Sequence, residues 1–141
     1  MPFLCYLINQ LRTHPQFPFP VLKMDITDLE SIQQGVRTML TNEGRIDASV
    51  NCAGYGIIGA FEETLITEAR TMFETNFFGL VAITQEVLKS MWAKKSGTIV
   101  NLSSIGGLMG LPFQSFYSAS KYAIEGVSEA MSMEQLLGIS K

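Results

Sequence analysis

Two side chains near the end of the sequence combine the groups needed to move a proton on or off an oxygen atom. Tyr117 and Lys121 are four residues apart, which places them on one face of a helix. A tyrosine hydroxyl, with an ordinary pKa of about 10, is a poor base at neutral pH. An ammonium about 4 Å away contributes roughly 4 kcal/mol at an effective dielectric of about 20 and so favours the phenolate. In isolation the pair is better explained as an ordinary helix face with an aromatic and a solvated lysine, so a functional interpretation depends on the motifs around it.

Predicted strands and helices alternate along the sequence, and the Tyr117–Lys121 pair lies in the last predicted helix. The segment 27–30 (Thr-Asp-Leu-Glu) is a capping box that starts a helix, and Gly44 lies just past that helix's end. Alternation of this kind is typical of an α/β fold with parallel strands joined by crossovers. The predicted strands are 21–25, 46–52 and 98–102, and the predicted helices are 28–42, 67–94 and 115–137.

Polar or small residues follow each predicted strand. They are Asp25, the segment 51–54 (Asn-Cys-Ala-Gly) and the segment 101–104 (Asn-Leu-Ser-Ser). Ligands of open α/β sheets bind outside the carboxyl ends of the strands. The sequence therefore predicts that these segments and the Tyr117–Lys121 pair surround one site.

The predicted helix 67–94 carries one broad apolar face that is interrupted in its middle. Asn76 and Gly79 are poor helix formers, so we expect a bend or a specific packing requirement there. The apolar face consists of Met72, Phe73, Phe77, Leu80, Ile83, Val87 and Met91.

Composition excludes several classes of protein. The chain has 141 residues, a net charge of -3 and no long run of one sign, so neither a nucleic-acid footprint nor a polybasic membrane patch is indicated. Cys5, Cys52 and the single histidine, His14, lack metal-site spacing, so we expect no metal. A soluble protein of the reducing cytoplasm is the expectation. We expect residues 1–141 to form one incomplete domain, with 1–19 as an irregular leader or the end of a helix.

These motifs together resemble those of the short-chain dehydrogenase/reductase family. The segment 51–54 is similar to its Asn-Asn-Ala-Gly, and residues 117–121 (Tyr-Ser-Ala-Ser-Lys) match its Tyr-x-Ala-Ser-Lys. Asn76 matches the asparagine of its central helix, and Ser104 lies thirteen residues before Tyr117, the family's usual spacing. Residues 25–26 (Asp-Ile) resemble its adenine-contacting Asp-Val, and residues 106–113 look most like hydroxysteroid and retinol dehydrogenases.

The resemblance implies a partial Rossmann-like, doubly wound parallel sheet, comprising strands 3, 4 and 5 with flanking helices. It implies NAD(P)-dependent interconversion of a secondary alcohol and a ketone, on a steroid- or retinoid-like substrate. The implied catalytic residues are Ser104, Tyr117, Lys121 and Asn76, with Lys121 also on the nicotinamide ribose and Asn76 holding a relay water. The implied cofactor-binding residues are Asp25, Ile26, Asn51, Ala53, Gly54, Tyr117 and Lys121.

The sequence departs from the family pattern at its start. No Thr-Gly-x-x-x-Gly-x-Gly loop, which holds the pyrophosphate in the family, precedes Asp25. We therefore interpret the chain as a fragment without that loop and without the substrate lid, and leave NAD and NADP both open. The alternative is a catalytically silent member that serves as an interaction module. In either case the resemblance implies a homo-oligomer formed through helices 67–94 and 115–137.

Several neighbouring residues receive plainer interpretations. We expect Ser103 to be a hydrogen bonder at its strand end, and Cys52 to be a small packed residue without a redox role. Leu108, Met109 and Phe113 either line an apolar substrate pocket or close the core, and the sequence leaves both open.

Overall fold

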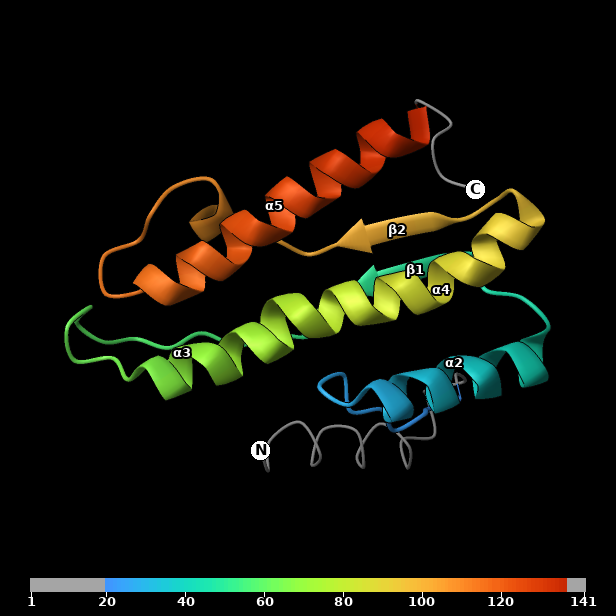
Figure 1. The fold of residues 1–141 in the computed structure, drawn as a ribbon, viewed down its shortest axis with the longest axis horizontal. Coiled ribbons are helices and arrows are strands. Elements are labelled where there is room, and N and C mark those ends of the chain that lie inside the picture. Colours follow the sequence, from blue (N-terminus) through green and yellow to red (C-terminus); the bar gives the residue numbers. More distant parts are fainter. Residues whose placement is uncertain (1–19, 137–141) are drawn as a thin grey trace.

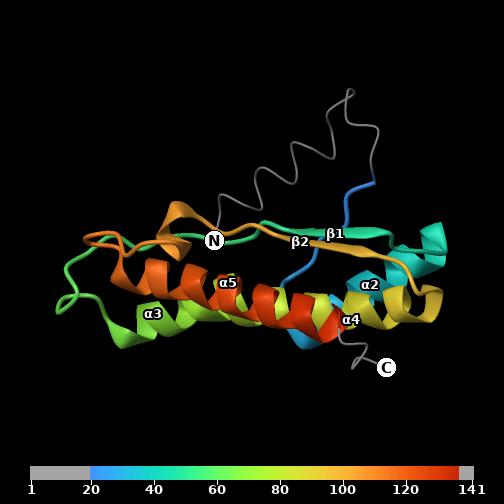
Figure 2. The ribbon, with the colours of Figure 1, turned by 90° about the horizontal axis from the view of Figure 1, so that it is seen from above.

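The chain folds into two layers, a small parallel sheet and a layer of helices on one of its faces (Figure 2). The computed structural model describes residues 20–136, so the predicted leader 1–19 and the last residues, 137–141, lie outside the described part. Strand β1 (Ala48–Asn51) pairs in parallel with β2 (Thr98–Asn101), with Asn51 opposite Asn101. The α/β class and the parallel arrangement of these two strands are confirmed.

The helices follow the alternating order that the sequence predicts. Helix α2 precedes β1, the long crossover α3–η1–α4 joins β1 to β2, and α5 follows β2 (Figure 1). Their bounds are α2 (Leu29–Glu43), α3 (Ile66–Phe73), η1 (Glu74–Gly79), α4 (Leu80–Lys94), η2 (Ile105–Gly107) and α5 (Ser115–Leu136).

Helix α2 is delimited by its cap residues. The carboxylate of Asp28 accepts a hydrogen bond from the Glu30 backbone N–H, and Gly44 closes the other end with a left-handed φ of 74°. The predicted Thr27 cap is wrong by one residue, because the Thr27 hydroxyl donates instead to Asp25 at 2.7 Å. Helix boundaries set by short-range contacts of this kind are readable from the sequence to within a residue or two.

The strand predicted at 21–25 is not formed. A strand is held by hydrogen bonds to a neighbouring strand, and among residues 20–136 the sheet has only the two strands β1 and β2. The segment instead ends in a turn, in which the Asp28 N–H donates to the Asp25 carbonyl at 3.3 Å. Its apolar side chains still pack, since Met24 lies against the core between α2 and α4.

The core lies between α2, α4 and the sheet. Ile32 and Val36 from α2 meet Val87 and Met91 from α4, and all four side chains are buried. Val87 and Met91 belong to the predicted apolar face, as do the buried Met72 and Leu80.

The interruption predicted in helix 67–94 is a turn of π-helix, η1. Asn76 and Gly79 both lie in it and are buried. A Cβ on Gly79 would stand 2.7 Å from the backbone oxygen of Ile26, so only glycine lets the 25–26 segment approach this closely. The π-helix thus positions a site residue and admits a neighbouring chain segment.

Candidate active site

A cavity of about 530 Å³ lies at the carboxyl ends of β1 and β2, and it brings Ser104, Tyr117 and Lys121 together. The three residues come from the segment after β2 and from the first turns of α5, as the sequence predicts. The other lining residues are Cys52, Gly54, Tyr55, Gly56, Leu102, Ser103, Leu111 and Gln114.

The backbone just after β2 holds the side chain of Lys121. Its side chain is buried, and its Nζ donates a hydrogen bond to the Leu102 carbonyl at 2.9 Å. The Leu102 peptide is itself fixed, because its N–H donates to the Asn51 carbonyl at 2.9 Å. The ammonium lies 5.8 Å from the centre of the Tyr117 ring. The end of the sheet therefore fixes the cation relative to the tyrosine.

Two glycines make room for the Tyr117 ring. A Cβ on Gly56 would stand 3.5 Å from the ring, and one on Gly106 would stand 3.4 Å from it. The Tyr117 side chain is half-buried, so its ring is packed while it borders the cavity. This arrangement suits a group that exchanges a proton with a bound molecule.

Ser104 caps the short helix η2 and faces the same cavity. Its Oγ accepts a hydrogen bond from the Gly106 N–H at 3.1 Å. That bond uses an oxygen lone pair and leaves the hydroxyl proton available as a donor. Ser104 is thus oriented by the backbone and has a proton to give to an oxygen in the cavity.

Asn76 and Asn51 lie beneath the cavity, not in its lining. Asn76 is fully buried and donates to the Tyr55 carbonyl at 2.8 Å and to Ser120 at 3.2 Å, while its oxygen accepts from the Tyr55 N–H at 2.9 Å. Asn51 donates to Thr84 and, across the strand pair, to Asn101. Both side chains therefore hold the elements that carry the site.

The remaining predicted cofactor residues lie outside this cavity. Asp25 is exposed, and the hydrogen bonds that it accepts from the Thr27 side chain and backbone lower the pKa of its carboxyl group. Ile26 lies against Gly79, and Ala53 is exposed next to Gly54.

Two of the plainer interpretations are wrong. The Ser103 hydroxyl is buried without a hydrogen-bond partner in the described part of the chain, although we expected a strand-end hydrogen bonder. Cys52 is exposed in the cavity and is not a small packed residue. Successive side chains of a strand point to opposite faces of the sheet. The sequence did not show which face the helices cover, so the burial of Cys52 and Ser103 could not be predicted.

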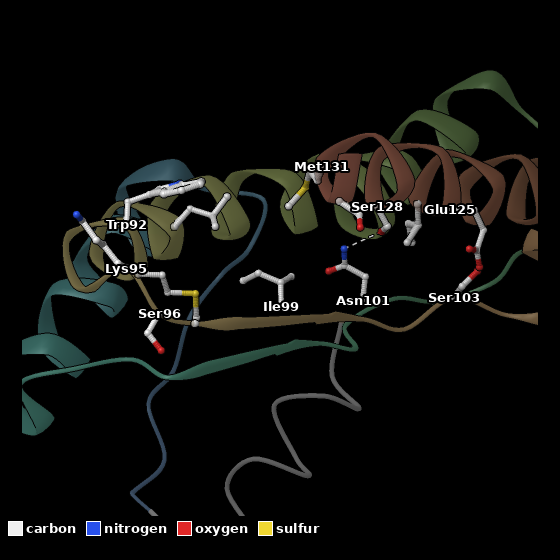
Figure 3. Close-up of a pocket in the computed structure, with 14 residues that line it drawn as sticks. Trp92, Lys95, Ser96, Ile99, Asn101, Ser103, Glu125, Ser128 and Met131 are labelled. Carbon is white, nitrogen blue, oxygen red and sulfur yellow. Dashed lines mark hydrogen bonds between the residues drawn. The ribbon is translucent and has the colours of Figure 1, made fainter. Parts of the chain in front are cut away.

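A second, larger cavity of about 840 Å³ lies between α4, β2 and α5 (Figure 3). Figure 3 shows Trp92 extending from α4, Met131 extending from α5, and the hydrogen bond from Asn101 to Ser128, which is 2.9 Å long. Neither Tyr117, Ser104 nor Lys121 lines it. Size therefore does not identify the candidate site, because the smaller cavity is the one lined by Ser104, Tyr117 and Lys121.

Comparison with known proteins agrees with this geometry. The family model described as short chain dehydrogenase matches residues 5–137. The chain belongs to the short-chain dehydrogenase family. It is 46% identical over 114 residues to a 3-ketodihydrosphingosine reductase of Bacteroides thetaiotaomicron, which covers 81% of this chain and 42% of that protein. It is 36% identical over 116 residues to human retinol dehydrogenase 8, covering 82% of this chain and 36% of that one.

Solved short-chain dehydrogenase structures share the fold. A short-chain dehydrogenase from Streptomyces avermitilis superimposes with a TM-score of 0.81 at 38% identity, over 91% of this chain and 47% of that one. The NADPH-bound Y152F variant of ElxO gives a TM-score of 0.82 at 28% identity, over 89% of this chain and 54% of that one. The chain thus spans about two-fifths of the length of the curated relatives and about half that of the solved structures.

The nicotinamide end of an NAD(P) site fits the residues present. Gly54 forms a cradle, since a Cβ there would stand 3.0 Å from the Asn76 oxygen and 3.8 Å from the Lys121 Nζ. Backbone that lacks a Cβ and faces an ammonium is what a ribose and its nicotinamide need for close approach. Separately, none of the helices within residues 20–136 combines the length and apolarity needed to span a bilayer.

Proposed function

We propose that this chain carries the proton-transfer half of an NAD(P)-dependent oxidoreductase that interconverts a secondary alcohol and a ketone. The observation that supports it is the single cavity shared by Ser104, Tyr117 and Lys121 at the carboxyl edge of the sheet. Membership of the short-chain dehydrogenase family and NADPH in the ElxO neighbour support the cofactor class.

The three side chains have different tasks in this proposal. The Tyr117 hydroxyl gives its proton to the carbonyl oxygen during reduction and takes it back during oxidation. Ser104 donates a hydrogen bond to the same oxygen and stabilises the charge that develops on it. Lys121 places its positive charge 5.8 Å from the centre of the Tyr117 ring and, with the Gly54 backbone, would hold the nicotinamide ribose. A bound nicotinamide supplies or accepts the hydride.

We assign Asn76 the role of holding a water molecule next to Gly54. The Asn76 oxygen and the Lys121 Nζ both lie within 4 Å of the point where a Gly54 Cβ would stand. A water in this space would accept from Lys121 and donate to the second lone pair of the Asn76 oxygen. Such a water would return the proton that Tyr117 gives up.

The substrate is proposed to be an apolar alcohol or ketone. Two relatives are, by name, a reductase of 3-ketodihydrosphingosine and a dehydrogenase of retinol. Leu108, Met109 and Phe113 are exposed around the site, so they do not close the core, and we assign them to the substrate side. A steroid- or retinoid-like molecule falls within this class.

A second candidate is a catalytically silent family member that binds a partner through α4 and α5. The observation that favours it is the exposed apolar surface of α5, which includes Tyr122 and Met133. Intact Ser104, Tyr117 and Lys121 favour the enzyme.

The test is the substitution Tyr117→Phe in the protein that carries these residues. It removes the hydroxyl and keeps the packed ring, so we expect kcat for ketone reduction to fall by at least about 100-fold. Tyr122→Phe, on the exposed side of α5, is the matched control and should retain the wild-type rate. A Tyr117→Phe protein with more than about a tenth of the wild-type rate would exclude the proposed role, and a wild type without turnover would favour the silent module.

A further inference from the structure

Two loops at the mouth of the cavity are joined into one structure. We call residues 54–65, which follow β1, the first rim loop, and residues 105–114, which follow β2, the second rim loop. The Gly59 N–H of the first donates to the Phe113 carbonyl of the second at 2.9 Å. Beside this bond, the rings of Phe61 and Phe116 stack with centres 5.4 Å apart and planes 15° from parallel. Both loops lie at the same end of the molecule (Figure 1).

Phe113 adopts a backbone conformation that favours glycine. Its φ is +61°, one of two non-glycine residues with positive φ in the described part of the chain. A bulky residue in this region is a true outlier and persists only where its surroundings impose it. The Gly59 hydrogen bond is such a constraint. The strain is not offset by burial of the ring, because the residue is 65% exposed.

The rim is predominantly apolar. The second rim loop contains no acidic or basic residue, and the first contains only the adjacent pair Glu62 and Glu63. The rim nevertheless exposes more than half of the surface of several large apolar residues, which are Ile58, Phe61, Leu65, Leu108, Met109 and Phe113. An exposed apolar patch of this kind is typical of a binding surface.

The rim continues into the catalytic cavity. Leu111 and Gln114, on either side of Phe113 in the second rim loop, both line the cavity. On the opposite side Gly56, in the first rim loop, lies against the Tyr117 ring. A molecule whose oxygen reaches Tyr117 therefore passes the rim on its way out of the cavity.

We propose that the two rim loops form a subsite for an alkyl chain of the substrate, with Phe113 as its specificity-determining residue. This inference builds on the proposed function and narrows its substrate class. The exposed apolar side chains of the two loops offer a track that a flexible alkyl chain can follow. Gly59 holds the Phe113 backbone so that its ring forms part of this track.

The experiment compares two ketones that differ only in alkyl length, butan-2-one and octan-2-one. Their dissociation constants are measured by saturation-transfer NMR titration, and their turnover by the absorbance of NADPH. One fully buried methylene contributes roughly fourfold in affinity, so the open rim should favour octan-2-one by about tenfold. Phe113→Gly removes the ring but suits the left-handed backbone, and it should reduce this preference to below about threefold without lowering the melting temperature.

Three further variants complete the design. Phe113→Leu, which stays apolar, should keep most of the preference. Phe113→Asn tolerates the left-handed backbone and serves as a second ring deletion if Phe113→Gly does not fold. Met133→Ala removes a comparably exposed apolar side chain from the far end of α5 and should change nothing.

The outcomes separate the subsite from the proposed reaction. Equal binding of the two ketones by the wild type, or an unchanged preference in both ring deletions, would overturn the subsite. Preferred binding of octan-2-one that depends on Phe113, without turnover of either ketone, would support the subsite and contradict the proposed oxidoreductase activity.

Discussion

Asn76 joins three parts of the chain through one buried amide. It bonds the Tyr55 backbone from both sides, fixing the loop after β1, and it bonds Ser120 on the helix that carries Tyr117 and Lys121. A buried polar group of this kind stabilises the fold only while all its partners are present.

We expect Asn76→Ala to lower the free energy of unfolding by about 2–4 kcal/mol. The substitution leaves the Tyr55 N–H and carbonyl without their partner in a part-buried position, and each such group costs roughly 1–3 kcal/mol where water cannot reach it. Urea unfolding followed by circular dichroism measures the loss. Asn42→Ala, at the exposed end of α2, should change stability by less than about 0.5 kcal/mol. A small effect at Asn76 would mean that the loop holds its position without this amide.

At the residue scale, the sequence predicted which candidate site residues meet better than it predicted their surroundings. Ser104, Tyr117 and Lys121 do meet, because their types and spacing follow from the reaction they would serve. The Leu102 carbonyl that receives Lys121 was not predicted, since any residue type supplies a backbone oxygen. Ser103 was misjudged because its burial depends on Gly107 and Lys121, whose backbone lies beside it only in the folded chain.

At the scale of the elements, one carboxylate ties the entry of β1 to the end of α4. Asp47 accepts hydrogen bonds from Arg45 at 2.9 Å and from Lys94 at 2.8 Å. These partners lower the pKa of Asp47 to about 2. Lys94 also donates to the Ile46 carbonyl at 2.6 Å, so the two elements share a polar connection of several bonds.

The lowered pKa of Asp47 predicts a pH-dependent contribution to stability. An aspartate with a depressed folded-state pKa stabilises the fold above its unfolded pKa of about 3.9, and this contribution disappears as the pH falls towards about 2. We therefore expect Asp47→Asn to melt below the wild type at pH 6, and the difference to close by pH 2. Glu43→Gln, an exposed carboxylate at the end of α2, should show no such convergence. A difference independent of pH would contradict the role of the charge.

Two of the helical glycines, Gly79 and Gly126, provide a test of close approach. A Cβ on Gly79 would meet the Ile26 oxygen at 2.7 Å, whereas one on Gly126 would meet nothing within 4 Å. Gly79→Ala should destabilise the chain by roughly 1–3 kcal/mol through overpacking. Gly126→Ala should stabilise it by up to about 1 kcal/mol through helix propensity alone. Thermal melts of the two variants measure these changes in stability. Equal shifts of the melting temperature would show that the 25–26 segment does not press on η1.

Helices and strands were predictable to different degrees. The bounds of α2 and α5 follow from caps and periodicity, which are local properties of the sequence. The segment 21–25 has the composition of a strand, yet a strand also needs a partner, and partners are not encoded locally. The interruption at Asn76 and Gly79 was predictable as a disturbance, but its form as a π-helix was not.

At the scale of the whole molecule, the described sheet has an unpaired edge. Strand β2 pairs only with β1 within residues 20–136, and Val100 on it is 42% exposed. An exposed edge rich in β-branched residues is a template for pairing with another chain. Apolar side chains on α5, such as Tyr122 and Met133, add further exposed surface.

We therefore expect the 141-residue chain by itself to self-associate. Size-exclusion chromatography with light scattering should show species larger than the monomer at micromolar concentration. Val100→Lys places a charge on the exposed side of the edge strand and should shift the distribution towards monomer. A monodisperse wild-type monomer with one cooperative thermal transition would contradict this account of the edge.

The fold class and the family could be predicted from the sequence because several family motifs occur along the chain in the order typical of the family. The comparisons confirm both. The extent of the sheet was not predictable, since the chain spans only about half of the length of the solved structures.

The π-helix has a consequence for how the site comes into being. A π-turn carries one more residue than the α-helical turn it replaces, and each residue of an α-helix turns the chain by about 100°. The side-chain faces of α3 and α4 are therefore offset in phase across Glu74–Gly79. Any helix that a peptide of residues 66–94 forms in water would be regular α-helix, because an isolated π-turn is unfavourable, and Asn76 would then point in a different direction. The orientation of Asn76 is thus acquired only when the helix docks against the loop after β1 and against α5, which makes this part of the site a late product of folding.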